Sequence, residues 1–313
     1  MSLYIRVLFL VLVFVPFISS APPPNLTKDY YQKTCPDFSK IVRETVTPKQ
    51  GQQPTTAGGT LRLFFHDCFL EGCDASVLIA TNSFNKAERD DDLNESLPGD
   101  AFDIVTRIKT ALELSCPGVV SCADILAQAT RDLVTMVGGP FYEVKLGRKD
   151  GRESKAHKVK GNLPLASQSV PDMLSIFKKN GFTLKELVAL SGGHTIGVSH
   201  CKEFSNRIFP NTDPGLDARF AGVLKNLCKN YTTNKTMAAF LDPVTPGNSI
   251  TSSDQILFKD TSTRPFVELY ANNQTAFFED FARAMEKLGT VGVKGEGDGE
   301  VRRRCDHFNN LNV

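Results

Sequence analysis

The chain has 313 residues, enough for one sizeable hydrophobic core or for two lobes that share a cleft. Lys and Arg number 36 against 35 Asp and Glu, so the formal net charge is +1. Because there is neither a basic excess nor an acidic tail, the charge balance gives no support for a nucleic-acid partner.

Residues 1–21 are predicted to form a secretory signal peptide. Arg6 supplies a basic start, an apolar run extends from Val7 to Phe17, and small residues lead to Ala21. This run is too short to predict a membrane span, and no later segment reaches spanning length. We therefore expect a secreted protein without a membrane partner, located outside the cell, in the cell wall or in the vacuole.

Two further features fit a secreted protein. Eight cysteines in such a chain predict disulfides, whose connectivity the spacing alone does not define. Asn-X-Ser/Thr sequons at Asn25, Asn230, Asn234 and Asn273 suit a glycosylated surface, and a fifth sequon, at Asn94, is expected to be buried.

Apolar residues recur at helical spacing along most of the chain, which predicts a mostly α-helical protein with little β-structure. Residues 50–59 read as a polar, glycine-rich lead-in, residues 82–99 and 149–160 as polar loops, and Phe141–Leu146 as a short strand. The predicted helices are Tyr30–Val46, ending before Pro48, then Leu61–Leu70, Phe102–Leu114, Cys122–Met136, Val170–Lys179, Thr183–Leu190 and Phe277–Leu288. No linker divides residues 22–313.

The predicted helix at Leu61 carries two charged or titratable side chains in an apolar segment. Arg62 and His66 are four residues apart, so they project from one face of the helix. Placing them in an apolar environment is costly unless they are used there. A histidine can take and return a proton near neutral pH, and an arginine can stabilise developing negative charge. For an isolated pair, a structural histidine and a surface-reaching arginine are the commoner outcome.

The residues that follow favour a functional interpretation. Asp67, Gly72, Asp74 and Ser76 lie close together in a segment that contains Cys68 and Cys73. Carboxylates, a hydroxyl and the carbonyls of a tight turn form the kind of oxygen cage that suits Ca²⁺. The spacing differs from the twelve-residue helix-loop-helix pattern, so the residues by themselves make calcium only one option.

Two motifs resemble those of one family. RLFFHDCFLEGCDAS closely resembles the distal-haem signature of the secretory plant peroxidases, the class III haem peroxidases, and ELVALSGGHTIG resembles their proximal motif. The resemblance implies the haem peroxidase fold, with two helical lobes, haem b in the cleft between them, four disulfides and little β-structure. The distal lobe would include about residues 22–165 plus the C-terminal helix, and the proximal lobe about residues 166–270.

The resemblance also implies roles for individual residues around the haem. Arg62, His66 and Asn94 would be catalytic, with Asn94 accepting the N–H of the distal histidine. His194 would be the axial ligand of the haem iron, and Asp254 would accept its other ring N–H. Phe65 would lie against the haem and Pro164 would meet aromatic substrates at the haem edge. His157, His200 and His307 match no functional position.

Calcium ligands and disulfide pairs are implied in the same way. The distal calcium ligands would be Asp67, Leu70, Gly72, Asp74, Ser76 and the outer-shell acid Glu88; the proximal donors would be Thr195, Asp242 and Thr245. The implied disulfides are Cys35–Cys116, Cys68–Cys73, Cys122–Cys305 and Cys201–Cys228.

One segment departs from the family pattern. Between Thr245-Pro246 and Ser253 only six residues stand, where family members carry an F-D-N-x-Y-Y segment and a further helix, so about a dozen residues are missing. The missing aspartate is a family ligand of the proximal calcium, so we expect that site to be weak or empty. In the family the missing element also braces the proximal pocket, so the shortening puts the contact between Asp254 and His194 in doubt. The shortening is either genuine or a gene-model artefact.

Two functions follow from the sequence. The first is a secreted monomeric haem peroxidase that reduces hydrogen peroxide and oxidises small phenolic donors in one-electron steps. The second is a non-catalytic cell-wall glycoprotein that binds haem poorly because of the missing segment before Ser253. The presence of all five residues expected to act at the haem favours the enzyme: Arg62, His66, Asn94, His194 and Asp254. A thiol or zinc enzyme is disfavoured because the cysteines are expected in disulfides.

Overall fold

The computed structural model describes residues 25–241 and 251–310 of the chain. The expected signal peptide, Asp242 and Thr245 lie outside these residues. The described part is mostly helical, with one short antiparallel pair of strands, β1 Val198–His200 and β2 Ala238–Phe240. The α-helices are α1 Phe38–Gln52, α2 Thr56–Leu70, α3 Gly99–Ser115, α4 Cys122–Met136, α5 Val170–Lys179, α6 Leu184–Ser191, α7 Cys201–Ile208, α8 Ala218–Leu227, α9 Ser252–Lys259, α10 Arg264–Asn272 and α11 Gln274–Leu288. Short 3₁₀ turns occupy Ser76–Leu78, Glu88–Asp90, Ala156–Lys158 and Gly192–Thr195.

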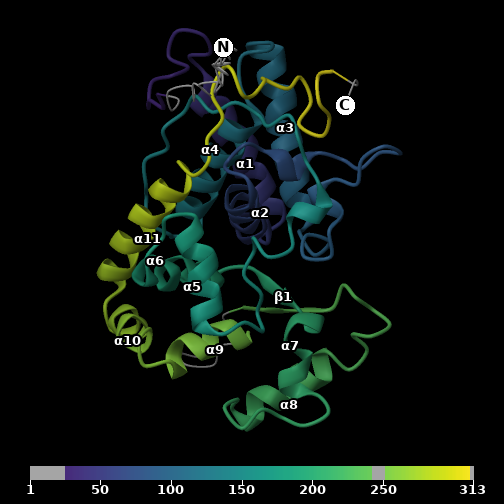
Figure 1. The fold of residues 1–313 in the computed structure, drawn as a ribbon, viewed down its shortest axis with the longest axis vertical. Helices are drawn as coiled ribbons and strands as arrows, with labels where there is room; N and C mark the ends of the chain where they lie inside the picture. Colours follow the sequence, from purple (N-terminus) through teal and green to yellow (C-terminus); the bar gives the residue numbers. More distant parts are fainter. Residues whose placement is uncertain (1–24, 242–250, 311–313) are drawn as a thin grey trace, which may run out of the picture.

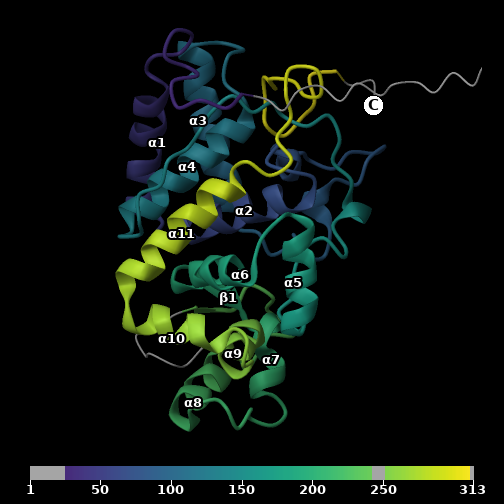
Figure 2. The same ribbon diagram turned by 60° about the vertical axis from the view of Figure 1, so that its left-hand side comes forward.

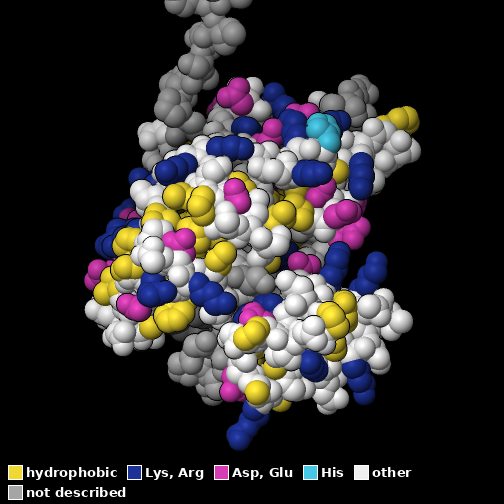
Figure 3. All heavy atoms as spheres, turned by 60° about the horizontal axis from the view of Figure 1, so that its bottom comes forward, with side chains coloured by type: hydrophobic (Ala, Val, Ile, Leu, Met, Phe, Trp, Pro, Cys, Tyr) yellow, Lys and Arg dark blue, Asp and Glu magenta, His cyan; other side chains and the backbone are white. Residues whose placement is uncertain are grey.

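Helix α2 lies at the centre of the larger part of the molecule, against α3 and α4, and α11 runs beside α6 (Figures 1 and 2). One continuous core of buried apolar residues joins α1 to α6 with α11. A second, smaller core joins α7, α8 and β2, and this small lobe forms the lower end of the molecule in Figure 1. Lys and Arg side chains stand out from the surface at this end in Figure 3.

The disulfide pairs are those that the resemblance implied. Cys35–Cys116, Cys68–Cys73, Cys122–Cys305 and Cys201–Cys228 are all bonded, which uses every cysteine of the chain. The bridge between Cys122 and Cys305 spans 183 residues and ties the C-terminal segment to the start of α4. In the loop-entropy view it restricts the unfolded chain more than the other three bridges do.

The first predicted helix was wrong at both ends. Residues 30–37 form turns, and α1 begins at Phe38 and continues through Pro48 to Gln52. Proline lacks the N–H that the helix ladder needs, which is why the sequence predicted an end there. Tertiary packing overrides this local cost: Val46 is fully buried, and Lys49, in the turn after it, donates to Asp103 of α3 at 2.8 Å.

The strand predicted at Phe141–Leu146 is also absent from the described structure. Only Leu146 is paired, through two backbone hydrogen bonds with Thr27. The next backbone amides, of Gly147 and Arg148, donate to the carboxylate of Asp124 at 2.7 and 3.3 Å, so a buried side chain takes the place of a partner strand.

Part of the glycine-rich lead-in belongs to the distal helix. Helix α2 begins at Thr56, so Gly58 and Gly59 are helical. A Cβ atom on Gly58 would lie 2.7 Å from Gly197 Cα, so glycine allows α2 to approach the segment after His194. Gly58, which the sequence placed in a loop, therefore brings the two histidine-bearing segments together.

Candidate active site

Helix α2 presents Arg62 and His66 together, as the four-residue spacing predicted. Arg62 Nε donates to His66 Nε2 at 3.2 Å, and both side chains are partly buried. The guanidinium is further fixed by Ser96, whose carbonyl oxygen and hydroxyl lie 3.1 and 2.9 Å from Arg62 Nη1 and Nη2. Arg62 thus has a fixed geometry, and sequence analysis did not anticipate Ser96.

Asn94 contacts the other nitrogen of the same ring. His66 Nδ1 lies 2.7 Å from Asn94 Oδ1, and Asn94 is buried, as expected. Because an amide oxygen only accepts, this hydrogen bond places the proton on Nδ1 and leaves Nε2 unprotonated, with its lone pair accepting the N–H of Arg62 Nε. Burial and the positive charge of Arg62 lower the pKa of His66, the hydrogen bond with Asn94 raises it, and the net result is a pKa of about 3. The ring is therefore a neutral base.

His194 lies in the 3₁₀ turn Gly192–Thr195 that follows α6. Its Nδ1 atom is 2.8 Å from Asp254 Oδ1, across 60 residues of sequence. The contact between Asp254 and His194 that the resemblance implied is therefore present, despite the shortened segment. Asp254 is three residues after Thr251, the N-cap of α9, and the Thr251 hydroxyl donates to Asp254 Oδ2 at 2.5 Å. Capping thus orients the carboxylate, and the T-x-x-D spacing is a sequence signal for it.

Charge distinguishes this histidine from His66. Asp254 raises the pKa of His194, and this effect outweighs burial and the more distant Arg62, both of which lower it. About half of the His194 side chain is accessible (48 %), whereas Nδ1 is held by the carboxylate. Nε2 is therefore the ring atom left to bind a metal.

Phe65 lies beside His66 on α2 with a ring-centroid distance of 6.2 Å. It stacks on Phe69 at 4.1 Å and packs near Phe177 of α5, so an aromatic cluster holds its ring in place. Pro164 is partly buried in the loop that precedes α5. Thr195 is exposed, and its hydroxyl donates to the Gly192 carbonyl oxygen at 3.0 Å.

The expected calcium loop brings three carboxylates into the interior. Asp67, Asp74 and Glu88 are 2 % exposed or less, and Ser76 donates to Glu88 Oε2 at 3.0 Å. Burial raises the pKa of all three carboxyls, and Asp67 and Asp74 further raise that of Glu88, to about 9. Glu88 Oε1 is buried without a hydrogen-bond partner. Such a site is electrostatically unfavourable unless a cation or protons compensate the charge.

Backbone and side chain connect this loop to His66. Asn94 Nδ2 donates to the carbonyl oxygen of Glu88 at 2.8 Å, and Asn94 Oδ1 contacts His66. Gly72, which adopts a φ of 117°, and Leu70 lie at the end of α2 in the same loop. Among the described residues, no group of three or more His, Cys, Asp or Glu side chains is arranged to bind a metal. A cation there would therefore depend on carbonyl and hydroxyl oxygens as well as carboxylates.

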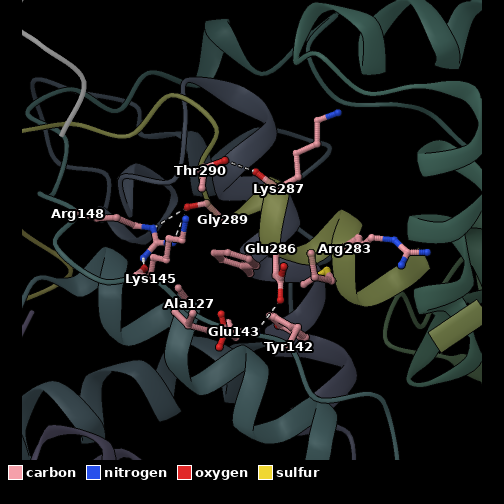
Figure 4. Close-up of a pocket in the computed structure, with 13 residues that line it drawn as sticks. Ala127, Tyr142, Glu143, Lys145, Arg148, Arg283, Glu286, Lys287, Gly289 and Thr290 are labelled. Carbon is pink, nitrogen blue, oxygen red and sulfur yellow. Dashed lines mark hydrogen bonds between the residues drawn. The ribbon is translucent and has the colours of Figure 1, made fainter. Parts of the chain in front are cut away.

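A cavity of about 410 Å³ lies elsewhere, between residues 142–148 and the C-terminal part of α11 (Figure 4). Phe64 lines it from the face of α2 that carries neither Arg62 nor His66. None of the residues predicted to act on peroxide lines this cavity, and its Arg148 and Lys287 are occupied by the carboxylates of Asp124 and Glu186. We assign it no role in the reaction.

The fold and the two histidine sites define the class of protein, and the comparisons with known proteins agree. The sequence profile of the peroxidase family matches residues 42–273, so the chain belongs to the peroxidase family and is a plant haem peroxidase. It is 87% identical to peroxidase 41 of Arabidopsis thaliana over the whole of both chains. It is also 73% identical to peroxidase 65, with 98% of this chain and 96% of the relative covered, and 52% identical to peroxidase 63, with 93% of each covered.

The first of these alignments also bears on the missing residues. It spans 326 positions and covers all 313 residues of this chain, so about 13 positions of that relative have no counterpart here. The number agrees with the shortening expected before Ser253. Nothing in these similarities favours a non-catalytic protein: the chain is an enzyme that uses peroxide to oxidise donor molecules.

No helix in the described ranges is long and apolar enough to cross a membrane. Four of the five sequon asparagines, Asn25, Asn230, Asn234 and Asn273, are exposed, and the fifth, Asn94, is buried.

Proposed function

We propose that this peroxidase is secreted, holds haem b through His194, and oxidises small phenolic donors in one-electron steps after hydrogen peroxide has reacted. The observation that carries the proposal is the pairing of two histidines with different partners. His66 Nδ1 is bound to a neutral amide and His194 Nδ1 to a carboxylate. The first ring thus suits proton transfer and the second suits metal ligation.

The residues present fit haem. His194 has its Nδ1 held by Asp254, so Nε2 would bind the iron as a proximal ligand. Gly192 begins the turn that carries His194, and its missing side chain leaves room for the ring of Phe277 behind that turn. Haem would supply an iron that binds peroxide and a ring system that accepts oxidising equivalents. Asp254 would make the imidazole more electron-rich, which favours the ferric state.

Three side chains would carry the proton chemistry. His66 Nε2 would take a proton from the peroxide and return it to the leaving oxygen, because its pKa lies well below neutral and its Nδ1 proton is held by Asn94. Arg62, anchored on Ser96, would stabilise the negative charge that develops as the O–O bond breaks.

Two further residues would control access to the haem. Phe65 would screen the haem so that donors deliver electrons at its edge, and Pro164 would present its carbonyl oxygen to phenols there. A carbonyl oxygen can accept a hydrogen bond from a phenolic hydroxyl, which is the chemistry this role requires.

We further propose that the distal loop holds one calcium ion. Asp67, Asp74 and Ser76 would bind through side chains, Leu70 and Gly72 through carbonyl oxygens, and Glu88 from the outer shell. The buried carboxylates with raised pKa values and the unpartnered Glu88 Oε1 support a cation here. At the proposed proximal calcium site Thr195 is exposed, and a weak or empty site remains our proposal.

We also propose where the enzyme is located and which molecules it meets there. The four disulfides and the exposed sequons support a secreted monomer, outside the cell, in the wall or in the vacuole, with hydrogen peroxide and small phenols as its partners. No nucleic-acid or membrane partner is proposed. The lobes would follow the family division, residues 22–165 with the C-terminal helix and residues 166–270.

The test is an absorption spectrum of the protein refolded with haem and calcium, before and after one equivalent of hydrogen peroxide. A high-spin ferric Soret band that falls and shifts with peroxide is the expected result. His194→Ala should lose or misligate the haem, whereas the exposed His157→Ala should not. A normal ferric spectrum in His194→Ala would refute the ligand assignment.

A further inference from the structure

Tyr270 is distinguished among the tyrosines of the described chain by its surroundings. It lies on α10, is partly buried, and its hydroxyl donates to Asp280 Oδ2 on α11 at 2.9 Å. Tyr31 has a similar carboxylate partner, Asp124, but is 3 % exposed, and Tyr142 is 2 % exposed. Tyr270 therefore combines access to the surface with a proton acceptor at hydrogen-bond distance.

An aromatic contact connects Tyr270 to the proximal site. The rings of Tyr270 and Phe277 are 5.6 Å apart between centroids. Phe277 in turn packs directly on Gly192, because a Cβ atom added there would collide with its ring. Gly192 begins the 3₁₀ turn that carries His194, so one aromatic ring and a short piece of backbone separate Tyr270 from the proposed iron ligand. Helices α10, α11 and α6 lie side by side in both ribbon views (Figures 1 and 2).

We propose that Tyr270 is an electron-relay residue through which the enzyme oxidises phenolic polymers that are too large to reach the haem edge. The step rests on the proposed haem ligation by His194. One electron leaves the Tyr270 ring for the peroxide-oxidised centre beside His194, while the phenolic proton moves to Asp280 Oδ2. A polymer phenol at the surface then gives one electron to the tyrosyl radical, Asp280 returns the proton, and the proton of the polymer phenol goes to water.

The charges around Asp280 support its role as acceptor. Lys185 and Arg283 contact its two oxygens at 2.8 and 2.7 Å. Burial acts to raise the pKa of Asp280, but hydrogen bonds from Lys185, Arg283 and Tyr270 outweigh it and lower that pKa. The carboxylate is therefore ionised and can accept the proton from Tyr270, and because Lys185 and Arg283 disfavour its protonated form, they favour the prompt return of that proton. The chain contains no tryptophan, so the usual alternative for such a relay is absent from the sequence.

The experiment uses the haem-loaded, full-length secreted enzyme, peroxide and a nitroso spin trap, with the adduct located by mass spectrometry. We expect the adduct on Tyr270 in the wild type and its loss in Tyr270→Phe. Tyr231→Phe is the matched control, because Tyr231 is also partly buried but lies in the small lobe, stacked on Phe209. Wild-type protein without an adduct on Tyr270 would overturn the proposal.

Comparing a polymeric donor with a small donor tests whether Tyr270 is needed only for large phenolic substrates. Tyr270→Phe should lose most oxidation of a tyramine-substituted dextran and keep wild-type oxidation of guaiacol. Asp280→Asn should do the same, because an amide cannot accept the phenolic proton. Equal rates on the dextran in wild type and Tyr270→Phe would refute the relay. Absence of guaiacol oxidation in the wild type would instead refute the proposed function, so the two failures are distinguishable.

Discussion

The two histidines of the site show how one residue type acquires opposite properties. His66 and His194 both lie within the electrostatic reach of Arg62, and burial lowers the pKa of each. The difference comes from the partner of Nδ1, which is the amide of Asn94 in one case and the carboxylate of Asp254 in the other. An amide cannot compensate an imidazolium charge, whereas a carboxylate does. The first histidine is therefore neutral, as our proposed base requires, and the second is electron-rich, as our proposed iron ligand requires.

The largest expected effect comes from removing the neutral base. His66→Leu should slow the reaction with peroxide by about 10²–10⁴-fold, the typical contribution of general acid–base catalysis, while haem stays bound. Stopped-flow absorption measures the rate. His157→Leu is the matched control, since His157 is exposed. An unchanged rate in His66→Leu would remove this residue from the mechanism.

Replacing the proximal carboxylate should have a smaller effect. Asp254→Asn gives His194 the same kind of partner that His66 has, so we expect a higher iron reduction potential and a loss of about 10–100-fold in activity or haem affinity. Spectroelectrochemistry measures the potential. Asp260→Asn, at the other end of α9, should leave it unchanged. A potential that does not move in Asp254→Asn would mean that the 2.8 Å contact does not tune the ligand.

Replacing the amide partner of His66 by a carboxylate should shift the pH at which the peroxide reaction slows. The pKa of His66 is lowered from 6.5 to about 3, so the wild-type peroxide rate should stay constant as the pH falls and decline only near that value. In the same interval the unfolded chain binds a proton that the folded state excludes, so stability also falls with pH. Asn94→Asp should raise the pKa of His66 and move the decline to higher pH. Identical pH–rate profiles in the wild type and Asn94→Asp would show that the residue at position 94 does not set the pKa of His66.

Calcium removal should give the smallest effect, confined to the distal side. The Glu88 carbonyl oxygen accepts from Asn94, so a chelator that disturbs this loop should loosen His66 and slow the peroxide reaction several-fold. The iron–histidine stretch in resonance Raman spectra should not change, because His194 lies outside the loop. A shift of that stretch with an unchanged peroxide rate would contradict the assignment.

Local sequence determined much of this protein. Helix α4 and helix α5 have the predicted limits, and Arg62 and His66 meet because residues four apart share a helix face. The predicted fold class and peroxidase activity were confirmed. These properties depend on near neighbours in the chain or on motifs of consecutive residues, which a sequence displays directly.

Tertiary structure decided what depends on distant residues. The shortened segment put the contact between Asp254 and His194 in doubt, yet with Thr251 capping α9 the carboxylate lies 2.8 Å from the ring. Pro48 remains inside α1, because packing outweighs a local cost. The approach of Gly58 to Gly197 joins segments far apart in sequence. Each of these outcomes depends on the interaction energy between groups that are far apart in the sequence. A short window of the sequence contains only one of the two groups, so it does not predict the outcome.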